Sequence, residues 1–165
     1  MTGGIVEGWS EFAVASAGAA GALAGLLIVA ISVNIREIIA DESLPKRALA
    51  TVVSVVAIMI GSLLLLVPGQ PPVLLGLELL VVTLVCGVFQ VASARAILRR
   101  GEHGPPGSMA VKVVTNIGQL VPLLVGSLLV CVPFPAALYW VAGGFLLIFV
   151  VAIANAWVLM VEILR

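Results

Sequence analysis

Long stretches of uncharged, apolar residues alternate along the chain with short segments that contain charges, prolines or glycines. A helix needs about 20 mostly apolar residues to cross about 30 Å of hydrocarbon. Lipid offers the backbone no hydrogen-bond partners, so each crossing must satisfy its own N–H and C=O groups as a helix. We therefore predict an all-α membrane helix bundle with five transmembrane helices, at about residues 12–33, 48–67, 73–94, 113–132 and 136–161.

Prolines divide the two longest apolar regions. The segment 113–161 carries no charge and is too long for one crossing. Proline removes a backbone donor and clashes with the preceding turn, but it is accepted at the first position of a helix. The pattern therefore predicts two helical hairpins whose tips contain Pro68, Pro71 and Pro72 in one case and Pro133 and Pro135 in the other.

The two predicted hairpins share a phrase. The sequence GSLLLLVP at 61–68 recurs as GSLLVCVP at 126–133, each directly before a predicted tip. We interpret this as a tandem hairpin repeat, with one copy at about 48–94 and the second at about 113–161. The first span resembles the descending arm of that unit, and residues 1–165 form a single membrane domain.

Positive charges indicate the orientation. With five spans, every basic residue falls on one side of the membrane, in the segments after the first and third spans or at the C-terminus. Such an excess marks the cytoplasmic side. We expect an N-out, C-in, multi-pass protein of the bacterial cytoplasmic (inner) membrane. The basic residues are Arg36, Lys46, Arg47, Arg95, Arg99, Arg100, Lys112 and Arg165.

Composition agrees with this location. The chain is 62% hydrophobic and 10% charged, with a mean hydropathy of +1.30, whereas soluble domains average about 45–50% apolar and about 25% charged residues. The formal net charge is zero, which argues against nucleic acid as a partner. Catalytic and phosphate-binding motifs are absent from the sequence, so we expect neither enzymatic activity nor a cofactor.

The first span carries a face of small residues, formed by Gly18, Gly21, Ala22 and Gly25. Small residues let transmembrane helices approach closely, so that packing replaces the hydrophobic drive that lipid cannot supply. This glycine face is either an oligomer interface or the surface that packs against the protein's own hairpins.

Amide side chains gather near the predicted cytoplasmic ends of four spans. They are either interhelical hydrogen-bonding groups that hold the bundle together or the wall of an inward-facing polar vestibule. We call this set the polar layer; its members are Asn34, Gln90, Asn116, Gln119 and Asn155.

Three further features bear on function. Glu78 is the only acid well inside a span, and it is either a group that binds a solute, proton or cation or a paired acid near the outer interface. Pro122 leaves the Gly118 carbonyl without its usual helical donor and predicts a kink in the fourth span. The lipid bilayer is the expected surrounding, and its anionic headgroups are possible partners of Arg95, Arg99 and Arg100.

The segment GWSEFAVASAGAAGALAGLLIVAISVNI, residues 8–35, resembles the opening of a family of small uncharacterised bacterial membrane proteins. The shared features are a Trp-Ser-Glu-Phe start, a first helix rich in glycine and alanine, and an asparagine at its end. The resemblance covers about the first 35 residues. It implies a multi-span membrane protein and no particular activity.

These features favour a non-enzymatic membrane protein that acts through helix–helix association, as a homo-oligomer or as an accessory subunit of a membrane complex. The alternative is an oligomeric channel or carrier for an ion or small solute, for which the polar layer, Glu78 and Pro122 would provide the pathway.

The orientation can be tested with reporter fusions. Reporters inserted at Gln70 and Phe134 are expected to be active only outside the cytoplasm, because both residues lie at predicted outer tips. A reporter at His103 is expected to be active only in the cytoplasm, because that segment carries basic residues on both sides. The reverse pattern would contradict the five-span, N-out arrangement.

Overall fold

The computed structural model describes residues 6, 8–40, 44–100, 114–132 and 134–161. This part of the chain is helical and has no strand. Five helical segments are long and apolar enough to cross a membrane, which confirms the all-α prediction and the predicted number of spans; the fourth, Val114–Cys131, contains α6 and a short helical stretch before it. The helix bounds are α1 Ser10–Val33, α2 Ile35–Ala40, α3 Leu44–Leu65, α4 Pro72–Arg100, α6 Val121–Cys131 and α7 Ala137–Val161.

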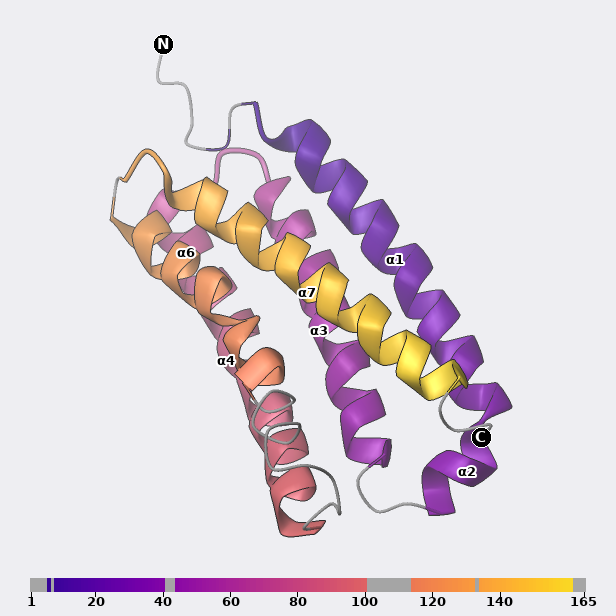
Figure 1. The fold of residues 1–165 in the computed structure, drawn as a ribbon. Helices are drawn as coiled ribbons and strands as arrows, with labels where there is room; N and C mark the ends of the chain where they lie inside the picture. The colour runs from indigo at the N-terminus through magenta and orange to yellow at the C-terminus, as the bar shows by residue number, and fades with distance from the viewer. Residues whose placement is uncertain (1–5, 7, 41–43, 101–113, 133, 162–165) are drawn as a thin grey trace.

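The long helices run alternately up and down and form one bundle (Figure 1). Helix α3 lies at the centre, where it contacts α1, α4 and α7, and α6 packs between α4 and α7. Helices α1 and α4 lie at opposite edges (Figure 1). Burial follows this layout: 56% of the most apolar stretch of α3 is buried inside the protein, against 22% for α1 and 28% for α4. Helices α1 and α4 therefore leave the largest share of their apolar stretches to be covered by a bilayer.

The first hairpin turns between α3 and α4 as its prolines predict. Pro72 is the first residue of α4, where its missing N–H has no helical acceptor in any case. Gly69 within the tip has φ +67°, a left-handed backbone conformation that glycine adopts without a steric penalty. Proline at the helix start and glycine in a left-handed conformation therefore allow α3 and α4 to be joined by a short tip.

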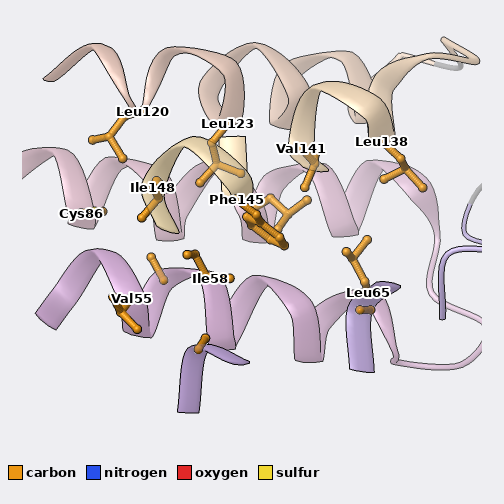
Figure 2. Packing of buried hydrophobic residues seen from close by; sticks show 14 of the residues in the cluster. Val55, Ile58, Leu65, Cys86, Leu120, Leu123, Leu138, Val141, Phe145 and Ile148 are labelled. Carbon is orange, nitrogen blue, oxygen red and sulfur yellow. The ribbon is translucent and has the colours of Figure 1, made fainter. Parts of the chain in front are cut away.

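The apolar core lies where α3, α4, α6 and α7 meet. Phe145 of α7 is fully buried. Figure 2 shows its ring between Ile58 of α3 on one side and Leu123 of α6 and Val141 of α7 on the other. Since lipid is as apolar as leucine, packing density rather than removal from water makes these contacts favourable.

Glycines permit the closest helix contacts. A Cβ at Gly126 would lie 2.7 Å from the backbone nitrogen of Val141, and a Cβ at Gly144 would lie 2.8 Å from the Cβ of Leu123. Both contacts join α6 to α7. Gly61 of the first hairpin similarly packs against the ring of Phe145. The glycine of the repeated phrase thus lies at a tight helix contact in both places where it occurs.

Aromatic rings join α1 to α7 at the tip end of the bundle. The rings of Trp9 and Tyr139 meet edge to face with their centroids 4.9 Å apart, and Trp9 contacts Phe12 in the same way at 5.8 Å. Such rings are favoured at the membrane–water interface. The start of α1 and the start of α7 therefore lie together at the end where we expect the outer interface.

The predicted helix at 113–132 is interrupted. Residues 114–118 are helical, Gln119 and Leu120 form a turn, and α6 begins at Val121, with Pro122 in its first turn. The Leu120 N–H donates to the Ile117 carbonyl, 3.1 Å away, which is a tighter turn than an α-helix makes. The interruption directly precedes the proline, whose ring has no N–H to continue the helical hydrogen bonds.

Gly144 and its neighbour Gly143 provide a matched test of α6–α7 packing. Gly144→Ala is expected to lower the free energy of unfolding by about 1–3 kcal/mol, because the new methyl group overlaps the backbone of Leu123. Gly143→Ala has open space and is expected to change it by less than about 1 kcal/mol, in the stabilising direction. Equilibrium unfolding in mixed micelles measures both; equal effects would contradict the close contact.

Candidate functional site

The polar layer lies in the half of the bundle opposite the hairpin tips. Gln90, Asn116 and Gln119 are almost fully buried, and Asn155 is half-buried. Polar groups in hydrocarbon need partners from the protein itself. The hydrogen bonds of these side chains therefore indicate whether the layer holds the helices together or lines a polar vestibule.

Gln90 joins α4 to α3. Its Nε2 donates to the Ser54 hydroxyl at 2.7 Å and lies 3.4 Å from the Ala50 carbonyl. The Ser54 hydroxyl lies 2.9 Å from the same carbonyl and 3.3 Å from the Cys86 sulfur. Ser54 is 1% exposed and Gln90 2% exposed, so this cluster is sealed from the surroundings of the bundle.

Asn155 joins α7 to two other elements. Its Nδ2 lies 3.2 Å from the Thr51 hydroxyl of α3 and 3.5 Å from Oδ1 of Asn116. The Thr51 hydroxyl also donates to the Arg47 carbonyl of its own helix at 2.9 Å. Through the hydroxyls of Thr51 and Ser54, the central helix α3 is thus hydrogen-bonded to both α7 and α4.

Gln119 lies at the interruption of the fourth span. Its Nε2 donates to the backbone carbonyl of Asn116 at 2.9 Å, and its Oε1 is buried without a hydrogen-bond partner among the described residues. Backbone that leaves helical geometry within a membrane is tolerated where protein or water covers it. Here protein covers it, because Gln119 is 2% and Leu120 7% exposed.

Asn34 occupies a different place from the other amides. It ends α1, where its Nδ2 donates to the Ala30 carbonyl at 3.0 Å. It also lines a mainly apolar groove between α1 and α7, with Ile153 and Trp157 on the other wall. The structure thus brings Asn116, Gln119 and Asn155 together. Gln90 is bonded to the same central helix, α3, to which Asn155 is bonded. Asn34 lies apart from them, at the end of α1.

Glu78 is far from the polar layer. It is half-buried in the first half of α4 and accepts a hydrogen bond from Nε2 of Gln70 in the hairpin tip. Gln70 and Ser10 also line a small cavity of about 270 Å³ at this end. Glu78 is therefore a paired acid near the tip, and the structure does not bring it together with the buried amides.

The glycine face of α1 points away from the bundle. Gly18, Gly21, Ala22 and Gly25 are all exposed, and a Cβ at any of the three glycines would have no heavy atom of the described residues within 4 Å. The opposite face makes the internal contacts, through Ala13, Ser16, Ala20, Leu27 and Ala30. Within the described part of the chain, no hairpin packs against this face.

The basic residues of α4 lie at the end of the bundle that holds the polar layer. Arg95 is exposed and lines a groove between α4 and the fourth span. Arg99 and Arg100 belong to the same helix, but their side chains lie outside the described part of the structure.

The hydroxyl groups of Thr51 and Ser54 were not recognised as part of the site from the sequence. Each receives an amide from another helix, and the two residues are three positions apart, so they share one face of α3. Both residues lie near the cytoplasmic end of the predicted second span, at the same level as the predicted amides, and this shared level is the signal that could have identified them. Among the described residues, no group of three or more His, Cys, Asp or Glu side chains is arranged to hold a metal ion.

Comparisons with models of protein families, with curated proteins and with solved structures find no match to this chain.

A double-mutant cycle tests the bond between Gln90 and Ser54. Gln90→Leu and Ser54→Ala are expected to be coupled by about 0.6 kcal/mol in unfolding free energy, the average for such bonds within a membrane bundle. Gln90→Leu with Ser127→Ala is the control, because the Ser127 hydroxyl bonds the Leu124 carbonyl of its own helix. Additive effects in both cycles would show that the hydrogen bond between Gln90 and Ser54 adds nothing to the stability of the bundle.

Proposed function

We propose that this protein is a non-enzymatic integral membrane protein that acts through helix–helix association, either as a homo-oligomer or as an accessory subunit of a membrane complex. The observation that carries the proposal is the outward-facing glycine face of α1. Four small residues within eight positions leave the helix backbone accessible along one exposed side. A second transmembrane helix fits such a side more closely than lipid chains do.

The distribution of contacts supports this interpretation. Helix α1 packs chiefly on α3 and less extensively on α7, so only one of its sides is used within the chain. The exposed side combines the glycines with Val14 and Val29, which are 59% and 60% exposed. Large apolar residues at the margins of a small-residue surface provide the walls against which a partner helix can pack.

The expected N-out orientation, the location in a bacterial cytoplasmic membrane and the tandem repeat are part of the same proposal. Lys46 and Arg47 begin α3, and Arg95 lies near the end of α4, so the described cations share the end of the bundle opposite the hairpin tips. The positive-inside rule assigns that end to the cytoplasm.

The second candidate function is an oligomeric channel or carrier for an ion or small solute. The helix interruption at Gln119 and Leu120 favours it, because discontinuous helices beside buried polar groups form the substrate sites of many transporters. The mutual hydrogen bonds of Asn155, Asn116 and Thr51 favour association instead, since these groups already use one another as partners.

Glycine substitution tests the proposed association. Native mass spectrometry of the detergent-solubilised protein is expected to show an oligomer or a co-purified membrane protein. Gly21→Leu and Gly25→Leu are expected to release monomer, because the larger side chain holds a partner helix away. Gly143→Leu on α7, which also has open space, is the control and is expected to leave the assembly intact.

A wild-type protein that is monomeric and brings down no partner would refute association. The same preparations distinguish the second candidate: ion or solute flux into proteoliposomes that is lost in Gln119→Leu or Glu78→Gln would support a channel or carrier. Absence of flux for a broad panel of ions and small solutes would count against it.

A further inference from the structure

A groove opens between α4 and the fourth span, on the opposite side of the bundle from α1. It encloses about 560 Å³ and is lined on one side by residues 83–95 of α4 and on the other by residues 117–124. Its walls include Leu84 and Val88, which are 56% and 68% exposed, whereas Leu120 in the groove is 7% exposed. The groove therefore opens toward the surface that faces lipid.

The polar side chains of the groove other than Arg95 already have partners. The Thr83 hydroxyl donates to the Leu79 carbonyl at 2.7 Å, and Gln90 donates to Ser54 of α3. Thr83 is 3% and Gln90 2% exposed. The surface that remains for a ligand is apolar along its length and cationic at the end where Arg95 lies.

The groove has the length of one leaflet of a bilayer and extends from the middle of the predicted span to its end. Thr83 lies at the middle of the membrane-spanning stretch Pro72–Ala96, and Arg95 lies at its end. The rise of a helix over these residues is about 18 Å, against about 15 Å for the hydrocarbon of one leaflet. An acyl chain that extends from the bilayer midplane along this groove therefore ends where the guanidinium of Arg95 is available to a headgroup.

We infer that this groove is a binding site for one anionic phospholipid, with an acyl chain between α4 and the fourth span and the headgroup phosphate on Arg95. Basic pockets between transmembrane helices are recognised sites for anionic headgroups, and a guanidinium matches phosphate oxygens in a two-point hydrogen bond. The inference goes beyond the proposed association and is independent of it, because the site lies on α4 and not on α1.

Gly87 allows the groove to be filled without disturbing the helices. A Cβ at this position would meet only the Cδ1 of Leu120, at the ordinary contact distance of 3.9 Å. Gly87→Phe is therefore expected to occupy the space of the acyl chain. Gly143→Phe adds the same ring at an open position on α7, outside the groove, and serves as the matched control.

The test is lipid titration of the full-length protein by native mass spectrometry, with phosphatidylglycerol and phosphatidylcholine of identical acyl chains as probes. The wild-type protein is expected to bind one phosphatidylglycerol saturably and in preference to phosphatidylcholine. Arg95→Gln is expected to weaken phosphatidylglycerol binding about fivefold, the equivalent of about 1 kcal/mol for one arginine, and to remove the preference. Gly87→Phe is expected to lose the saturable adduct with both lipids, and Gly143→Phe to keep it.

Several outcomes would overturn the inference. They are equal, unsaturable binding of the two lipids by the wild-type protein, an unchanged preference in Arg95→Gln, or unchanged binding in a folded Gly87→Phe protein. A change of oligomeric state in Gly87→Phe without any change in lipid binding would assign the groove to a second copy of the chain instead. Arg95→Gln alters an exposed side chain, so its result decides the matter even where Gly87→Phe does not yield folded protein.

Discussion

The structure depends on one constraint: inside hydrocarbon, the protein itself must provide every hydrogen-bond partner. The backbone meets this requirement through its helices, and at Gln119 and Leu120, where the fourth span leaves helical geometry, protein covers it. Among the side chains, the Thr51 and Ser54 hydroxyls of α3 receive amides from α7 and α4, whereas Oε1 of Gln119 has no partner among the described residues. A helix at the centre of the bundle can offer partners to several neighbours at once, and α3 is the helix with that position.

The two ends of the bundle are held together by different interactions. Near the hairpin tips, glycines allow close packing of α6 on α7, and the rings of Trp9 and Tyr139 join α1 to α7. In the opposite half, hydrogen bonds between amides and hydroxyls join α3 to α4 and α7. The outer surfaces of α1 and α4 take part in neither set of contacts, and the two proposals concern these surfaces: one assigns α1 to a partner helix, and the other assigns α4 to a lipid.

The spans and hairpins could be predicted from the sequence because hydropathy and proline act locally. Pro72 suits the first position of a helix wherever that helix later packs, and Pro122 has no N–H to donate to the Gly118 carbonyl in any surroundings. The outward direction of the glycine face could not be predicted, because α1 is apolar or small on every side and its sequence contains no polar stripe to indicate an interior. Thr51 and Ser54 lie at the depth of the predicted amide layer, but their partners could not be predicted, since a hydroxyl in a transmembrane helix can bond its own backbone and needs no neighbour.

The interrupted fourth span has a mechanical consequence. An intact helix resists bending because its ladder of hydrogen bonds would have to stretch, but here the Leu120 N–H bonds the Ile117 carbonyl instead of continuing that ladder, and Pro122 has no N–H to contribute. Across this turn, residues 114–118 are joined to α7 by the amide of Asn155, whose Nδ2 lies 3.5 Å from Oδ1 of Asn116. The fourth span is therefore expected to bend at this turn more easily than a continuous helix would.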